Sequence, residues 1–64
     1  MPTVHIEMFS GRDVETKRKM AAAVTEAITS TCNVKPEAVT VIINDMEPEN
    51  YANAGVLRID TLNK

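Results

Sequence analysis

The first residues of the chain alternate between apolar and polar positions. Val4, Ile6 and Met8 lie on one side of this pattern. The opposite side consists of Thr3, His5, Glu7 and Phe9. Because successive side chains of a strand point to opposite faces, the alternation predicts a strand over residues 3–9 with one buried face. A turn is expected next at Gly11, which can adopt a positive φ.

Apolar residues then recur at helical spacing between Val14 and about Thr31. The recurring positions are Met20, Ala21, Val24, Ala27 and Ile28. This spacing predicts an amphipathic helix that lays one face against a sheet. Asp13 is suited to cap the first turn of this helix, and Asn33 is suited to a left-handed cap at its end.

Residues 39–43 form a nearly continuous β-branched run, Val39-Thr40-Val41-Ile42-Ile43. Such a run is typical of a strand buried on both faces of a parallel sheet. A strand, a helix and a second strand within this length predict a right-handed βαβ unit. After a turn at residues 47–50, Ala54-Gly55 predicts the tip of a short hairpin that runs into Val56 and Leu57.

The predicted fold class is therefore α/β, with residues 1–64 forming a single small domain. One helix covers only one face of a two-stranded sheet, so the face that carries His5 and Ile42 needs cover from another subunit. A chain of 64 residues also has too small a core to be stable without reinforcement. Cys32 is the only cysteine, which excludes an internal disulfide, and no Cys/His cluster has zinc spacing. We therefore expect a homo-oligomer.

Charge and composition exclude several classes of partner. The net charge is -2 and the basic residues are scattered, so no broad basic face is expected for nucleic acid. Phe9 and Tyr51 are the only aromatic residues, too few for a base-stacking platform. No apolar run approaches the length of a membrane span, and no signal sequence opens the chain. A cytoplasmic protein without a membrane partner is expected.

Pro2 is the most informative position for chemistry. Initiator methionine is usually removed before a small residue, which would turn Pro2 into a free secondary amine at the start of a strand. An unperturbed terminal amine has a pKa of about 7.7 to 8.0, and burial lowers the pKa of an amine into the range that suits a general base. The alternative is that Pro2 is simply tolerated at the first position of a strand, where its missing N–H does no harm.

Five segments in a characteristic order span nearly the whole chain. They are Pro2-Thr3-Val4-His5-Ile6, Gly11-Arg12, Val24-Thr25-Glu26-Ala27-Ile28, Val41-Ile42-Ile43-Asn44-Asp45-Met46, and Asn50-Tyr51-Ala52 ahead of a glycine. Together they resemble the 4-oxalocrotonate tautomerase family. The resemblance implies short βαβ monomers assembled as hexamers. It also implies keto-enol tautomerisation of a small 2-hydroxy-dienoate or 2-oxo acid, with the amino-terminal proline as general base and no metal or cofactor.

The resemblance carries three roles onto this sequence. Pro2 matches the catalytic proline, Arg12 the arginine that binds a substrate carboxylate, and Tyr51 the aromatic residue that walls the pocket. Arginine suits its role because its planar fork binds a carboxylate bidentately. Without the resemblance, Arg12 would be interpreted as a solvated turn residue and Tyr51 as a residue packed between subunits.

The sequence departs from the family at Thr40, where a second arginine is expected. A single carboxylate clamp predicts that a monoacid reacts about as well as a diacid. Lys35 is the nearest upstream cation, but nothing in the sequence directs it to the pocket. The related hydrolytic dehalogenases add a water-activating carboxylate, for which Glu49 is the only candidate.

A non-enzymatic homo-oligomeric module that binds a ligand or a partner is the alternative from another functional class. Retention of Met1 would favour it, because the Pro2 nitrogen would then be an amide without a basic lone pair. His5 is expected to be structural, and Cys32 is expected to be inert because neither a helix N-terminus nor a paired histidine activates it.

Overall fold

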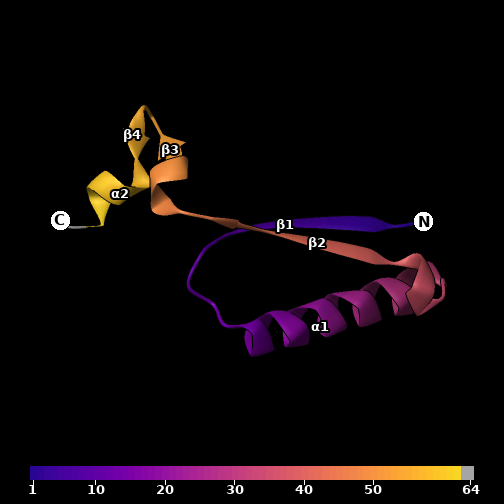
Figure 1. Ribbon diagram of the computed structural model, residues 1–64. Helices are drawn as coiled ribbons and strands as arrows, with labels where there is room; N and C mark the ends of the chain where they lie inside the picture. Colours follow the sequence, from indigo (N-terminus) through magenta and orange to yellow (C-terminus); the bar gives the residue numbers. More distant parts are fainter. Residues whose placement is uncertain (63–64) are drawn as a thin grey trace.

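The computed structural model describes residues 1–62. Figure 1 shows two long strands lying side by side, one long helix along them, and a small C-terminal unit that projects from the end of the strands. The elements in chain order are β1 (Thr3–Phe9), α1 (Val14–Cys32), η1 (Pro36–Ala38), β2 (Thr40–Met46), η2 (Pro48–Asn50), β3 (Ala52–Asn53), β4 (Val56–Leu57) and α2 (Arg58–Thr61). The predicted order of strand, helix, strand and short hairpin is confirmed.

β1 and β2 form a parallel pair. Their register runs from Thr3 opposite Thr40 to Phe9 opposite Met46. β2 begins one residue later and ends three residues later than the β-branched run alone predicts, because the ladder with β1 continues through polar residues as far as Met46. This pairing completes the predicted βαβ unit.

Both caps of α1 are as predicted. The Asp13 carboxylate accepts a hydrogen bond of 2.8 Å from the backbone N–H of Thr16. Asn33 adopts the left-handed conformation, with φ 56° and ψ 48°, and its N–H donates to the Thr29 carbonyl. These bonds satisfy backbone groups that an uncapped helix end would leave without partners.

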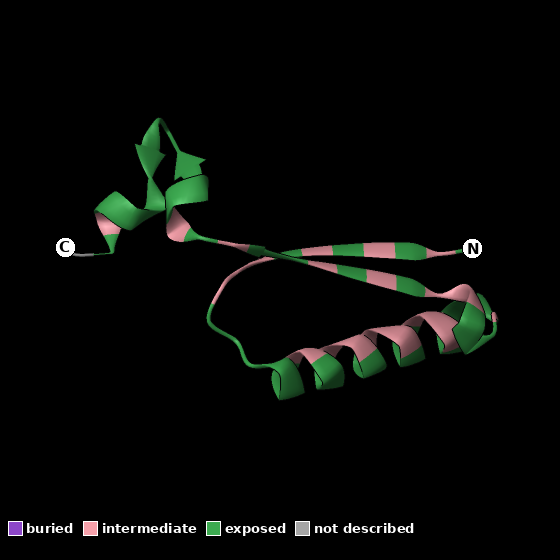
Figure 2. Cartoon of the chain, in the orientation of Figure 1, coloured by how far each residue is buried: buried purple, intermediate pink, exposed green. Residues whose placement is uncertain are grey.

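The sheet-facing side of α1 follows helical periodicity, but with a shifted phase. Its half-buried positions are Lys17, Met20, Ala21, Val24, Thr25, Ile28 and Thr29. Ala27, predicted to belong to this side, is exposed, while Thr25 and Thr29 take part in it. A helix turns by about 100° per residue, so Ala27 lies beyond the edge of a stripe centred on Val24 and Thr25. Figure 2 shows this stripe facing the strands.

No residue within the described part of the chain is fully buried. The face of the sheet turned away from α1 is open, and Ile42 on that face is 37% exposed. Within one chain β2 is therefore covered on the α1 side only, and its open face is the one that the sequence predicts to need cover from another subunit. The radius of gyration is 15.2 Å, against about 11 Å for a compact chain of this length. This open fold agrees with the expectation that other subunits complete the core.

The C-terminal hairpin turns at Ala54 and Gly55, as predicted. Both residues have positive φ, 54° and 80°, which is the geometry of a two-residue type I′ turn. The N–H of Arg58 donates to the Tyr51 carbonyl at 2.8 Å and closes the base of the hairpin. The single turn of helix α2 that follows was not predicted. No helix within residues 1–62 is long and apolar enough to cross a membrane.

Candidate active site

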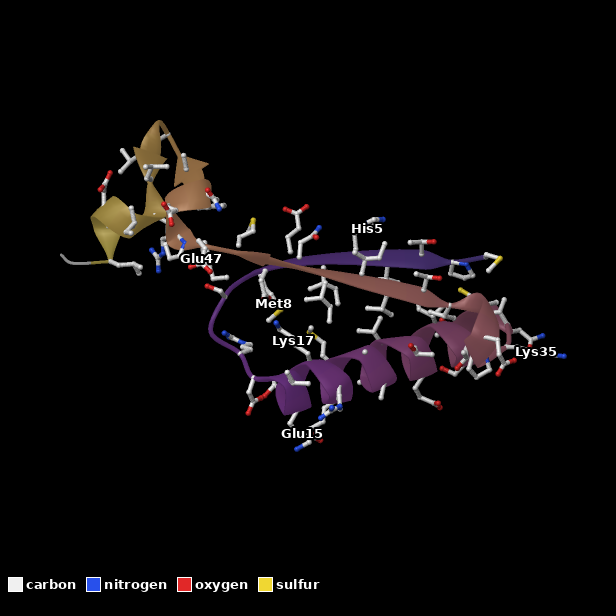
Figure 3. The ribbon with its side chains drawn as sticks, in the orientation of Figure 1. His5, Met8, Glu15, Lys17, Lys35 and Glu47 are labelled. Atoms are coloured by element: carbon white, nitrogen blue, oxygen red, sulfur yellow. The ribbon has the colours of Figure 1, made fainter. Side chains whose placement is uncertain are left out.

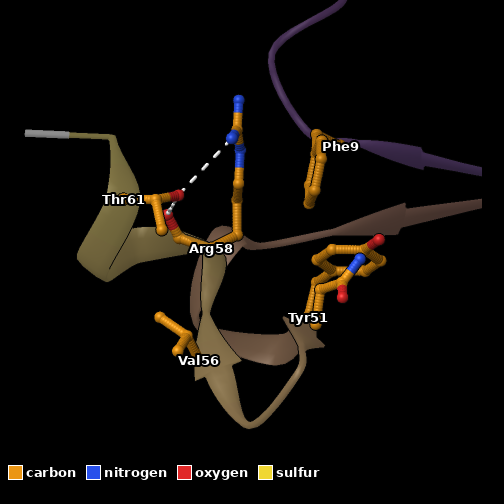
Figure 4. Close-up of a pocket in the computed structure, with 6 residues that line it drawn as sticks. Phe9, Tyr51, Val56, Arg58 and Thr61 are labelled. Carbon is orange, nitrogen blue, oxygen red and sulfur yellow. Dashed lines mark hydrogen bonds between the residues drawn. The ribbon is translucent and has the colours of Figure 1, made fainter. Parts of the chain in front are cut away.

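A pocket of about 340 Å³ lies where the end of β1 meets the C-terminal hairpin. Its lining residues are Phe9, Tyr51, Asn53, Val56, Arg58 and Thr61. Figure 4 shows that Phe9 comes from the end of β1, whereas the other labelled residues come from the hairpin and α2. A volume of this size suits a small organic molecule.

Two aromatic rings form one wall of the pocket. The ring centroids of Phe9 and Tyr51 are 5.2 Å apart and their planes are at 84°, an edge-to-face contact. The Arg58 guanidinium carbon lies 5.8 Å from the centroid of the Phe9 ring. This distance is within the range of a cation–π contact, which holds a positive charge against the aromatic wall.

The guanidinium of Arg58 also contacts the hydroxyl group of Thr61. Arg58 donates a hydrogen bond to the Thr61 hydroxyl at 3.4 Å. That hydroxyl in turn donates to the Arg58 carbonyl at 2.8 Å. The pocket therefore combines two aromatic rings, one cation and Asn53, a set of groups that suits a small planar anion.

Pro2 lies at the opposite end of β1 from the pocket. Its carbonyl accepts a 3.0 Å hydrogen bond from the N–H of Thr40, which fixes Pro2 at the start of the sheet. Pro2 is half-buried, and Met1 before it is 92% exposed. β1 has seven residues, and a parallel strand rises about 3.3 Å per residue, so its ends are roughly 20 Å apart.

Arg12 is exposed on the loop between β1 and α1. This loop follows Phe9, so Arg12 lies at the end of the sheet that carries the pocket, although it is not one of the lining residues. Of the three residues singled out in the sequence, only Tyr51 lines the pocket. Pro2 and Arg12 are separated by the length of β1 and do not meet within one chain.

The other sequence candidates lie outside the pocket. Glu49 is exposed on η2 and does not line it. Lys35 is exposed at the start of η1, and Figure 3 shows it at the far end of α1, away from the C-terminal unit. His5 points away from α1 on the open face of the sheet. Within residues 1–62, no three His, Cys, Asp or Glu side chains gather where they could hold a metal ion.

One ion pair ties the helix to the sheet near the pocket end. Lys17, in the first half of α1, pairs with Asp45 near the end of β2. In Figure 3, Lys17 and Met8 lie between the helix and the strands, whereas Glu15 points outward. The ion pair therefore fixes the start of α1, and with it the loop that carries Arg12, relative to the strand ends.

Sequence reasoning missed most of the pocket. The alternating pattern places Phe9 only on a strand face, and nothing in the sequence distinguishes Arg58 from the other scattered basic residues. Their contact joins residues 49 positions apart and depends on how the hairpin folds back toward β1. No local spacing in a single sequence carries that information.

Comparison with known proteins identifies the family. Residues 2–59 match the family model described as tautomerase enzyme. A probable tautomerase of Streptococcus pneumoniae is 43% identical over 58 residues, covering 91% of this chain and 97% of the relative.

Solved structures agree with this match. YwhB, a homologue of 4-oxalocrotonate tautomerase, is 37% identical with a TM-score of 0.87, covering 92% of this chain and 97% of its own. A structure from work on the 4-oxalocrotonate tautomerase isozymes of Methylibium petroleiphilum is 34% identical with a TM-score of 0.90, covering 97% of both chains. The βαβ subunit with its projecting hairpin therefore belongs to the 4-oxalocrotonate tautomerase family of tautomerase enzymes.

Proposed function

We propose that this protein is a cofactor-independent tautomerase that moves a proton on a small 2-hydroxy-dienoate or 2-oxo acid, with Pro2 as general base. The position of Pro2 carries the proposal. It is held at the start of β1 by the hydrogen bond from Thr40, and Met1 directly before it is exposed. Removal of Met1 would leave a secondary amine at a fixed point of the fold.

The chemistry needs one base that takes and returns a proton. The neutral Pro2 amine removes the proton of the substrate's 2-hydroxyl group, and the resulting ammonium gives a proton to a carbon of the conjugated chain. The enol becomes a ketone and the amine returns to its neutral form. We assign Arg12 the binding of the substrate carboxylate. Its positive guanidinium also stabilises the negative charge that develops on the neighbouring 2-oxygen.

The separation of Pro2 from the pocket supports a site shared between subunits. Within the described chain, β2 pairs with β1 along one edge, and no strand pairs with the other edge of β1. Antiparallel pairing of this edge with a second copy, in full overlap, would set Thr3 opposite Phe9 of the partner subunit. The base of one chain would then stand beside the aromatic pocket of the other.

Members of this family are oligomeric, and we propose a homohexamer built from such pairs. The open sheet face with Ile42 and the exposed apolar residues of the hairpin provide surfaces for further contacts. The cytoplasmic location expected from the sequence stays a prediction.

Ketonisation of phenylenolpyruvate by purified protein tests the proposed function. Pro2→Ala should lower kcat by about a hundredfold or more, which is the usual contribution of a general base. Pro36→Ala, which removes an exposed proline from η1, serves as the matched control and should retain wild-type activity. A wild-type protein that binds small carboxylates without ketonising the enol would instead support the non-enzymatic binding module.

A further inference from the structure

The pocket beside Phe9 contains a cation to which the family resemblance assigns no role. We infer that Arg58 is a substrate-binding residue that recognises a carboxylate in the pocket walled by Phe9 and Tyr51. This inference rests on the proposed function and deepens it. It gives the site a second cation besides Arg12, where Thr40 leaves the expected one missing.

The charge of Arg58 is not neutralised by an acidic side chain in the described chain. The ion pairs within residues 1–62 join Lys17 to Asp45 and Arg18 to Glu15. The one side-chain hydrogen bond found for Arg58 goes to the Thr61 hydroxyl. A guanidinium has five N–H donors, so most of them remain available to a ligand.

Arg58 is an exposed residue, and two contacts restrict its guanidinium. The Phe9 ring lies beside it at 5.8 Å, and the Thr61 hydroxyl fixes one of its nitrogens, as Figure 4 shows. A guanidinium ordered before binding loses less conformational freedom when it clamps a carboxylate. Because the ring planes of Phe9 and Tyr51 are at 84°, a planar, conjugated chain can stack on the face of one ring and meet the edge of the other.

The proposed shared site gives this cation a place beside the base. If β1 pairs with its copy in full overlap, Pro2 approaches Phe9 of the partner subunit, against which Arg58 of the partner subunit is stacked. The backbone N–H of Thr40 donates to the Pro2 carbonyl, so position 40 lies next to Pro2 in the sheet. In this pairing, Arg58 of the partner subunit lies near Pro2 and supplies the positive charge that Thr40 lacks.

Two cations change the expected substrate preference. Thr40 alone predicts that monoacids and diacids react alike. With both Arg12 and Arg58 at the site, a planar dicarboxylate finds a partner for each end. Lys35 is the competing cation, because it is exposed at the start of η1, at the same end of the sheet as Pro2.

Binding of two inert six-carbon dienes tests the inference. Muconate carries a carboxylate at each end, and sorbate has the same chain with one carboxylate. NMR titration of the intact oligomer should give a dissociation constant at least tenfold lower for muconate than for sorbate. Arg58→Ala should reduce this preference by about tenfold to a hundredfold, as expected for loss of one charge-assisted contact.

Two further variants test whether Arg58 binds the carboxylate through its guanidinium or acts only through its positive charge or as a structural support. Arg58→Lys should restore only part of the preference, because lysine keeps the charge and loses the planar fork. Lys35→Ala removes the exposed cation at the Pro2 end of the sheet and should leave the preference unchanged. A preference that is lost in Lys35→Ala and kept in Arg58→Ala would assign the second clamp to Lys35 and overturn the inference. Equal affinity of the wild type for muconate and sorbate would overturn the inference. An equal loss of affinity for both ligands in Arg58→Ala would also overturn it, because it would show that Arg58 supports the structure of the hairpin.

These outcomes are distinct from those that test the proposed function. Ligand binding does not require Pro2 to be a base, so an inactive wild-type protein could still prefer muconate. Conversely, a protein whose ketonisation depends on Pro2 could bind both dienes alike. In that case only the role of Arg58 would be rejected.

Discussion

Asp13 illustrates how one side chain determines where a helix begins. Hydrogen bonding by Thr16, first through its side chain and then through its backbone N–H, lowers the pKa of the Asp13 carboxyl below the ordinary value of 3.8. A carboxylate whose pKa is lower in the folded state stabilises that state at pH above 3.8. The stabilisation is lost as the pH falls through the lowered pKa.

The cap therefore predicts a defined pH response. Thermal unfolding followed by circular dichroism should show that Asp13→Asn costs little at pH 7, because asparagine also caps helices well. Between pH 4 and pH 2 the wild type should lose more stability than Asp13→Asn does. Glu37→Gln, which removes an exposed carboxylate outside the cap, should follow the wild type. Identical acid responses of the wild type and Asp13→Asn would show that the cap carries no proton-linked stability.

The sequence predicts the role of a single residue when that role depends on its neighbours along the chain. The caps Asp13 and Asn33 follow from local backbone geometry, and both were predicted. Tyr51 was placed at a pocket only through family resemblance. Arg58 was not recognised, because its contact with Phe9 is made between distant segments.

At the scale of elements, the C-terminal hairpin carries the only strained turn residue in the described chain besides the capping Asn33. Ala54 has φ 54°, which costs an L-residue with a Cβ roughly 1 to 2 kcal/mol. Asparagine tolerates this conformation better, and Asn-Gly is the preferred pair for a type I′ turn.

Ala54→Asn should therefore stabilise the protein, by up to about 1 kcal/mol per chain. The melting temperature at a fixed protein concentration measures this gain. Ala54→Val places a β-branched residue at positive φ and should lower the melting temperature. An unchanged melting temperature in both variants would contradict the type I′ turn.

The elements themselves were largely predictable, since alternation gives β1, helical spacing gives α1 and the β-branched run gives β2. The first and last residues of these elements were less predictable. β2 extends through Asn44 and Asp45 because β1 supplies backbone partners there, and no side-chain pattern marks that extension. The turn of α2 lacks both a capping side chain and the length that periodicity requires.

At the scale of the whole molecule, one chain exposes too much surface to be stable alone. Its accessible area is 4905 Å², against about 4,000 Å² for a folded monomer of 7.0 kDa. The open sheet face and the absence of a fully buried residue among those described explain the excess. Folding is therefore expected to be coupled to assembly.

Ile42→Asp tests this coupling, because it places a charge on the open face of the sheet. Light scattering should show dissociation, and the melting temperature should fall and depend more steeply on protein concentration. Ala22→Glu, on the exposed side of α1, is the matched control and should keep the oligomer intact. A wild-type protein that stays a folded monomer at micromolar concentration would refute the coupling.

The central claim is that the free amine of Pro2 is the catalytic base. Its most direct test is the kcat for phenylenolpyruvate ketonisation in two wild-type preparations, one with Met1 removed and one with Met1 retained, each verified by intact mass. The processed form should be active, and the Met1 form should be slower by a hundredfold or more, and slower than Pro2→Ala, because an amide nitrogen accepts no proton. Equal kcat values in the two preparations would contradict the account.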